Sequence, residues 1–247
     1  MRLKIIACKV LFRELSLVAA NSQNFTDVTY IRQGFHDTPE VLQKILQHEI
    51  DKIDAGEDTY TCKPNMDEDF DAVLLGYALC SNGIAGLSSK KYKIVVPRGH
   101  DCITMFLGSK EKYRKYFDSH KCVYWYSAGW IENTPMPGEK RYNNIRSQYI
   151  EKYGEENADY LMEMEQGWFK EYNWCTFIDW PELNNSSYKA FTRRCADFLN
   201  WNYDEITGDS TLLRDFIEGN WDDERFLIVP PGKTIEPTFD KKIIGLK

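Results

Sequence analysis

The sequence predicts an α/β protein with a doubly wound parallel sheet, arranged as two similar Rossmann-like lobes with a cleft between them. Short apolar runs alternate with amphipathic segments along the 247 residues, an order typical of β-α-β units. The second half repeats the alternation of the first, so we expect lobes over residues 1–120 and 121–247. Hydrophobic (43%) and charged (28%) residues occur in proportions ordinary for a globular protein. One continuous sheet is the alternative architecture.

Four strands and two helices are expected in the first half. The strands are apolar runs at residues 3–8, 28–31, 72–77 and 92–97. A helix is expected over 38–53, where apolar residues recur at helical spacing after Thr38 and Pro39. A second helix is expected over 101–117.

The second half is expected to hold three strands and three helices. The strands cover 122–126, 176–179 and 225–229, and the helices about 143–170, 187–201 and 211–218. Glycine and proline are frequent over 128–141, which favours a loop there.

Charge and apolar patterning exclude several classes of protein. The net charge is −7 and no basic stripe offsets it, so we expect no nucleic-acid partner. No apolar stretch approaches the ~20 residues of a membrane span. Lys9 and Arg13 interrupt the first apolar run, which therefore indicates a strand and not a signal peptide. We expect a cytoplasmic location, where the seven scattered cysteines are thiols or metal ligands.

Cysteine and histidine residues follow the ends of the predicted parallel strands. Cys8 ends the first strand, Cys80 follows the third, and His100 and Cys102 follow the fourth. Side chains from these ends meet at one edge of a parallel sheet. Three thiolates and an imidazole suit a tetrahedral zinc ion, and the same donors also suit an iron–sulfur cluster. Cys175 is a fifth candidate, as a late ligand or a nucleophile. The competing interpretation is that these cysteines are small buried hydrophobic residues.

Small polar residues and glycines surround the same edge. Glycine permits close approach of backbone to a ligand, and exposed N–H groups bind anions. The candidates for cofactor binding are Gly76, Tyr77, Asn82, Gly83, Arg98 and Ser127. Turn formation is the competing role of the glycines. Neither a GxGxxG nor a Walker A motif is present, which disfavours NAD and nucleoside triphosphates.

Two motifs, GYALCSNGIAGL at 76–87 and VVPRGHDCITMFLGSKEKY at 95–113, carry a family resemblance. They resemble DUF1638, a prokaryotic family of unknown function whose genes often lie beside those of corrinoid-dependent methyltransferases in anaerobes. The resemblance implies, by association, a role in methyl-group or one-carbon metabolism. It marks the same sheet edge, including Tyr77, Asn82 and Arg98.

Three functional hypotheses follow. The first is a metal-binding protein of corrinoid-linked one-carbon metabolism, with zinc as the expected metal and zinc-dependent methyl transfer as the expected reaction. The second is a non-catalytic accessory module that binds a corrinoid protein or a tetrapyrrole through its aromatic side chains. The third is a binder of another small molecule whose cysteines are structural.

Overall fold

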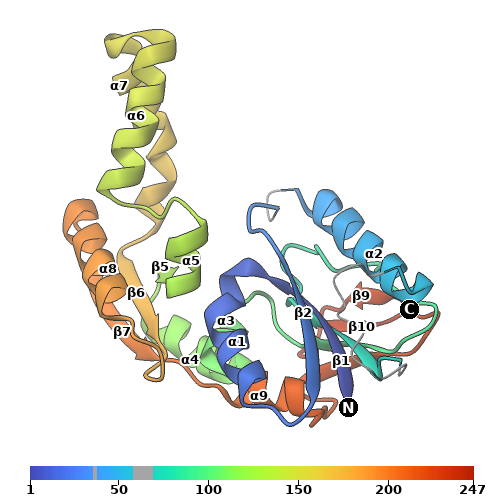
Figure 1. Cartoon of the computed structure of the whole chain (residues 1–247). Coiled ribbons are helices and arrows are strands. Elements are labelled where there is room, and N and C mark those ends of the chain that lie inside the picture. Colours follow the sequence, from blue (N-terminus) through green and yellow to red (C-terminus); the bar gives the residue numbers. More distant parts are fainter. Residues whose placement is uncertain (36–37, 58–68) are drawn as a thin grey trace. The chain divides into compact units, whose positions relative to one another are not determined.

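A computed structural model describes residues 1–35, 38–57 and 69–247 of the chain (Figure 1). These residues form two compact units, the first made of residues 1–112 and 209–247 and the second of 113–208. The chain thus leaves the first unit and later returns to it, whereas the predicted boundaries, 1–120 and 121–247, divide it once.

The first unit is built on a five-stranded sheet in the order β2-β1-β3-β4-β8. Its strands are β1 (Arg2–Cys8), β2 (Phe25–Ile31), β3 (Ala72–Gly76), β4 (Ile94–Pro97) and β8 (Phe226–Val229). The first four are mutually parallel, which confirms the α/β class and the four strands expected in the first half. Strand β8 runs antiparallel to β4, so the sheet is mostly and not entirely parallel.

The helices of the first unit match the expected helices only in part. They are η1 (Lys9–Leu11), α1 (Phe12–Ala20), α2 (Pro39–Ala55), α3 (Ile103–Leu107) and α9 (Thr211–Glu218), and α4 (Lys110–Ser119) leads into the second unit. The single helix expected over 101–117 is wrong, because Gly108 separates α3 from α4 at a φ of 79°. A β-carbon on Gly108 would lie 2.6 Å from that of Asp209, so only glycine fits. A short antiparallel pair, β9 (Ile235–Pro237) and β10 (Ile244–Leu246), completes the unit.

The second unit contains a three-stranded parallel sheet, β5-β6-β7. Its strands are β5 (Val123–Tyr126), β6 (Trp174–Asp179) and β7 (Asn202–Thr207), and α8 (Ser186–Leu199) connects the last two. Strand β7 was not expected, because its sequence NYDEIT is largely polar and only partly buried.

Two expectations for the second unit are wrong. The segment 128–141 is not a continuous loop: α5 (Ala128–Asn133) begins where the Ser127 hydroxyl accepts a hydrogen bond from the Trp130 amide at 3.2 Å. The long helix expected over 143–170 is broken at Gly154, whose φ is 81°. It forms α6 (Glu139–Tyr153), α7 (Glu155–Glu165) and η2 (Gly167–Glu171), and α6 and α7 lie side by side as a hairpin (Figure 1).

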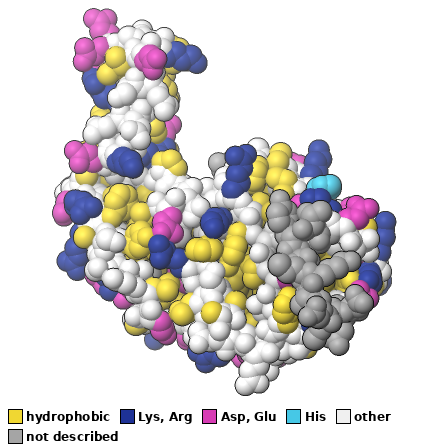
Figure 2. All heavy atoms as spheres, viewed as in Figure 1, with side chains coloured by type: hydrophobic (Ala, Val, Ile, Leu, Met, Phe, Trp, Pro, Cys, Tyr) yellow, Lys and Arg dark blue, Asp and Glu magenta, His cyan; other side chains and the backbone are white. Residues whose placement is uncertain are grey.

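The surface carries both signs of charge. On the face shown in Figure 2, Lys and Arg side chains are interspersed with Asp and Glu. Among the helices of the described residues, none is long and apolar enough to cross a membrane.

Candidate functional site

The order of the strands singles out one edge of the five-stranded sheet. From β1 the chain adds β2 on one side and then returns to add β3 and β4 on the other. The order therefore reverses between β1 and β3, and open α/β sheets bind ligands outside the carboxyl ends of the strands at such a point. Cys8 is the last residue of β1, and Tyr77 directly follows β3.

Cys8, Tyr77 and Cys80 form what we call the edge cluster. Each side chain is almost fully buried, with 4%, 2% and 5% of its surface exposed. Burial raises the pKa of Tyr77, and the nearby Cys8 and Cys80 raise it further, so the three groups lie within electrostatic reach of one another. Burial also raises the pKa of the Cys8 thiol to about 11 and that of Cys80 to about 12. Both free thiols are therefore protonated near neutral pH.

The loops after β3 and β4 are joined beside this cluster. The amide of Leu79 donates to the Gly99 carbonyl and that of Cys80 to the His100 carbonyl, both at 2.9 Å. Asp101 lies close enough to Cys80 for its carboxylate to contribute to the raised pKa of the thiol. The two family motifs thus meet at the carboxyl edge of the sheet.

The hydroxyl of Tyr77 is buried and has no hydrogen-bond partner within the described residues. A buried polar group left in this state costs about 1–3 kcal/mol. Such a cost in a native structure calls for an explanation, and an acceptor on a ligand would supply one.

The turn that follows is strained. Cys80, Ser81 and Asn82 are successive non-glycine residues in the left-handed region, with φ of 46°, 57° and 67°. That conformation costs L-residues roughly 1–2 kcal/mol each. The Gly83 amide closes the turn on the Cys80 carbonyl at 2.9 Å, and the Gln43 side chain donates to the Asn82 carbonyl, also at 2.9 Å. Strain of this kind concentrates at ligand and active sites.

The other predicted metal ligands are placed differently. His100 is exposed, whereas Cys102 is buried at the start of α3. Across residues 1–35, 38–57 and 69–247, no three His, Cys, Asp or Glu side chains are grouped closely enough to hold a metal ion. As placed, the described residues therefore do not fit a closed tetrahedral zinc site, which needs four ligands.

Four of the predicted cofactor-binding residues have structural contacts. A β-carbon on Gly76 would lie 2.6 Å from that of Ala7, and one on Gly83 would lie 2.5 Å from Leu42, so both glycines permit close packing. Arg98 is 3% exposed. It donates to the carbonyls of Asp223 and Phe226 at 2.9 and 3.1 Å and to the Asp223 carboxylate at 2.8 Å. Ser127 caps α5 in the second unit. Binding by these residues stays a prediction, as it does for the exposed Asn82.

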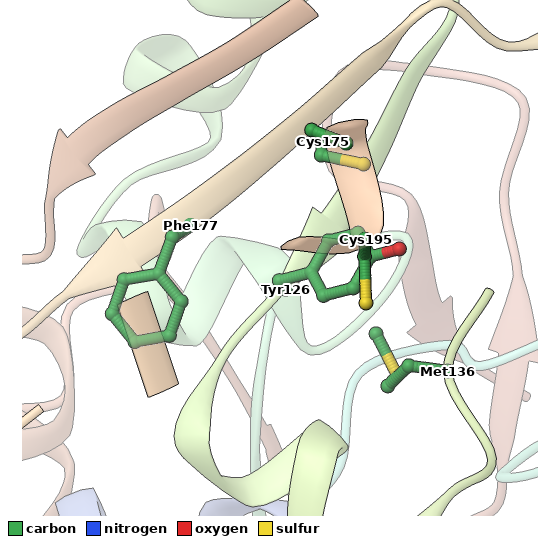
Figure 3. Close-up of a cluster of buried hydrophobic side chains, with 6 residues drawn as sticks. Tyr126, Met136, Cys175, Phe177 and Cys195 are labelled. Carbon is green, nitrogen blue, oxygen red and sulfur yellow. The ribbon is translucent and has the colours of Figure 1, made fainter. Parts of the chain in front are cut away.

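Cys175 lies in the second unit, buried in β6 beside Tyr126 and Cys195 (Figure 3). We call these three residues the core cluster. The Tyr126 hydroxyl donates to the Pro137 carbonyl at 2.8 Å. Burial raises the pKa of Cys175 to about 12 and that of Cys195 to about 11. Sequence reasoning missed Cys195, although its position on the buried face of α8, one turn from Thr192, was a usable signal.

The described residues thus form a mixed α/β protein that carries the edge cluster at the carboxyl ends of parallel strands. Residues 30–217 match the family model described as "Protein of unknown function (DUF1638)", and the chain belongs to that family. No curated protein and no solved structure matches the chain.

Proposed function

We propose that this protein binds a small ligand at the edge cluster and acts in methyl-group metabolism, as an enzyme or as an accessory module for a corrinoid protein. The observation that carries the binding role is the Tyr77 hydroxyl, which is buried beside two thiols without a hydrogen-bond partner in the described chain. A ligand that offers an acceptor would remove this cost. The strained turn at 80–82 supports the same location.

The link to methyl groups and corrinoids rests on the family resemblance alone. The doubly wound, two-lobed Rossmann-like architecture and the cytoplasmic location predicted from the sequence are parts of the same proposal. A small molecule or a corrinoid protein is the proposed partner.

The other candidate ligand is a metal group that binds thiolates. Zinc is the first choice and an iron–sulfur cluster the second. Such a metal group is favoured by the nearness of the Cys8 and Cys80 thiols. Both thiols would have to lose their protons to bind a metal, so their raised pKa opposes binding near neutral pH. Cys102 and His100 are the residues that the sequence supplies for the remaining positions.

Equilibrium dialysis of the anaerobically purified protein against hydroxocobalamin, and separately against Zn²⁺, tests both forms of the proposal. We expect one of the two probes to be retained at about one per chain, and Tyr77→Phe or Cys80→Ser to reduce retention about tenfold, the effect of one buried interaction of ~1.4 kcal/mol. Tyr126→Phe and Cys195→Ser are matched controls from the core cluster and should leave retention unchanged. Retention of neither probe, or equal loss in the controls, would contradict a ligand site at the edge cluster.

A further inference from the structure

A cavity of about 550 Å³ lies within the second unit, apart from the edge cluster. The end of α5, the start of α6 and one residue of α8 line it. The lining residues that matter here are Ile131, Thr134, Met136, Lys140, Arg141 and Phe191. Its volume falls within the range of small-molecule sites, roughly 300–1,000 Å³.

Two buried polar atoms of the lining residues have no hydrogen-bond partner anywhere in the described chain. They are Nη1 of Arg141 and Oγ1 of Thr134. Each such atom costs about 1–3 kcal/mol, and more where the group is charged. Both residues line the cavity, and an acceptor bound there within reach of these two atoms would offset the costs.

The rest of Arg141 is held in place. Its Nη2 donates to the Glu165 carboxylate, and its guanidinium carbon lies 5.6 Å from the centre of the Trp168 ring and 5.5 Å from that of Phe169. These contacts fix the plane of the guanidinium group, so Nη1 is preorganised to donate. Lys140 adds a second, exposed cation to the lining.

The remaining lining is suited to an apolar body. Ile131, Met136 and Phe191 contribute hydrocarbon and aromatic surface. The carboxylate of Glu132, also in the lining, accepts a hydrogen bond from the Tyr188 hydroxyl at 2.6 Å. We propose that this cavity is a second binding site, which takes a small organic carboxylate, with its carboxylate on Arg141 and Thr134 and its apolar body against Met136 and Phe191.

Benzoate is the probe, with benzamide as its uncharged counterpart and inorganic phosphate as an anion without an apolar body. Amide chemical shifts of isotope-labelled protein report both the location and the affinity. We expect benzoate to shift the amides of residues 131–141 with a dissociation constant on the order of 1 mM, as suits a fragment of this size. Benzamide and phosphate should each bind about tenfold more weakly.

Substitutions of Arg141 and Thr134 test whether these two residues bind the carboxylate of benzoate. Arg141→Met should weaken benzoate about tenfold or more, the effect expected for a hydrogen bond to a charged group of ~1.5–3 kcal/mol. Arg114→Met is the matched control, because Arg114 is 82% exposed and does not line the cavity. Thr134→Val, with an expected loss of about threefold, decides the matter if Arg141→Met does not fold. Equal binding of benzoate and benzamide, benzoate shifts only at residues that do not line the cavity, or no effect of either variant would overturn the proposal.

Discussion

Each unit of this protein buries a tyrosine beside two cysteines, and the two clusters differ in the state of the tyrosine hydroxyl. In the core cluster the Tyr126 hydroxyl donates to a carbonyl at 2.8 Å. In the edge cluster the Tyr77 hydroxyl has no partner among the described residues. The thiols are alike, since burial raises the pKa of Cys80 and of Cys175 to about 12.

The comparison shows that buried cysteines do not by themselves indicate chemistry. The core cluster is satisfied and packs with Met136 and Phe177, so stability explains it. The edge cluster combines a hydroxyl without a partner among the described residues, a strained turn and a position at the strand-order reversal. No described residue offsets the cost of the buried Tyr77 hydroxyl, which is why the proposed ligand is placed at this cluster.

Two glycines beside the clusters should respond most strongly to substitution. A β-carbon on Gly138 would lie 2.6 Å from the Cys195 sulfur, at a φ of 146°, so Gly138→Ala should lower the free energy of unfolding by roughly 2–5 kcal/mol. Gly76→Ala, which crowds Ala7, should cost roughly 1–3 kcal/mol. Urea unfolding followed by tryptophan fluorescence measures both. Adding Cys195→Ala should recover part of the first loss and none of the second; recovery of both would show that the contacts are misassigned.

The next largest difference is expected between the contributions of the two tyrosine hydroxyls to stability. Tyr126→Phe removes a buried hydrogen bond and should lower the free energy of unfolding by about 1–2 kcal/mol. Tyr77→Phe removes a hydroxyl with no partner in the described chain, so it should change stability by less than about 0.5 kcal/mol or increase it. Thermal unfolding of both variants measures these changes in stability. An equal loss in the two would mean that Tyr77 is as well satisfied as Tyr126.

Alkylation rates compare how readily the clusters open. Burial raises the pKa of both Cys80 and Cys175 to about 12, so neither thiol is reactive until it becomes exposed, and the rate of alkylation mainly reports how often that happens. Cys80 lies in a surface turn and Cys175 in the central strand of its sheet. We expect Cys80 to react with iodoacetamide about tenfold faster at pH 8, measured by peptide mass spectrometry. The exposed Cys122 should react faster than either of them. A faster reaction at Cys175 would reverse the comparison.

The smallest effect concerns the strained turn. Ser81→Gly should raise the free energy of unfolding by about 0.5–1 kcal/mol, because glycine adopts a positive φ without steric cost. Asn200→Gly, at the isolated left-handed residue that ends α8, should change it less, since asparagine tolerates this region. Calorimetry of both variants tests the difference. A loss of stability in Ser81→Gly would show that the turn is not strained.

Apolar runs in the sequence located β1, β3, β5 and β8 to within one residue at each end. All seven residues of β1 are buried, and the apolar run alone located it. Strand β7 was not predicted, because partly exposed polar residues form it. The antiparallel direction of β8 was not predicted either, because an apolar run does not encode the direction of a strand. The breaks at Gly108 and Gly154 depend on positive φ, and a helical hydrophobic pattern does not reveal such angles.

The site was predictable in part. Cys8 and Cys80 end or follow neighbouring parallel strands, so their nearness followed from topology. The state of the Tyr77 hydroxyl did not follow from the sequence, because it depends on the absence of a partner among the described residues that surround it in the fold. Cys175 misled, since it is the second residue of β6 and therefore lies near the amino end of that strand, in the other sheet.

The return of residues 209–247 to the first unit has a consequence for the order of assembly. During synthesis the second unit is complete once residue 208 has left the ribosome. At that moment β4 still presents an unpaired edge, because β8 has not yet emerged from the ribosome, and an open edge invites pairing with other chains. Arg98 then holds residues 223–226 against the sheet by donating hydrogen bonds to the carbonyls of Asp223 and Phe226. Strand β8, which follows the whole second unit in the chain, thus closes the sheet that β1 to β4 began.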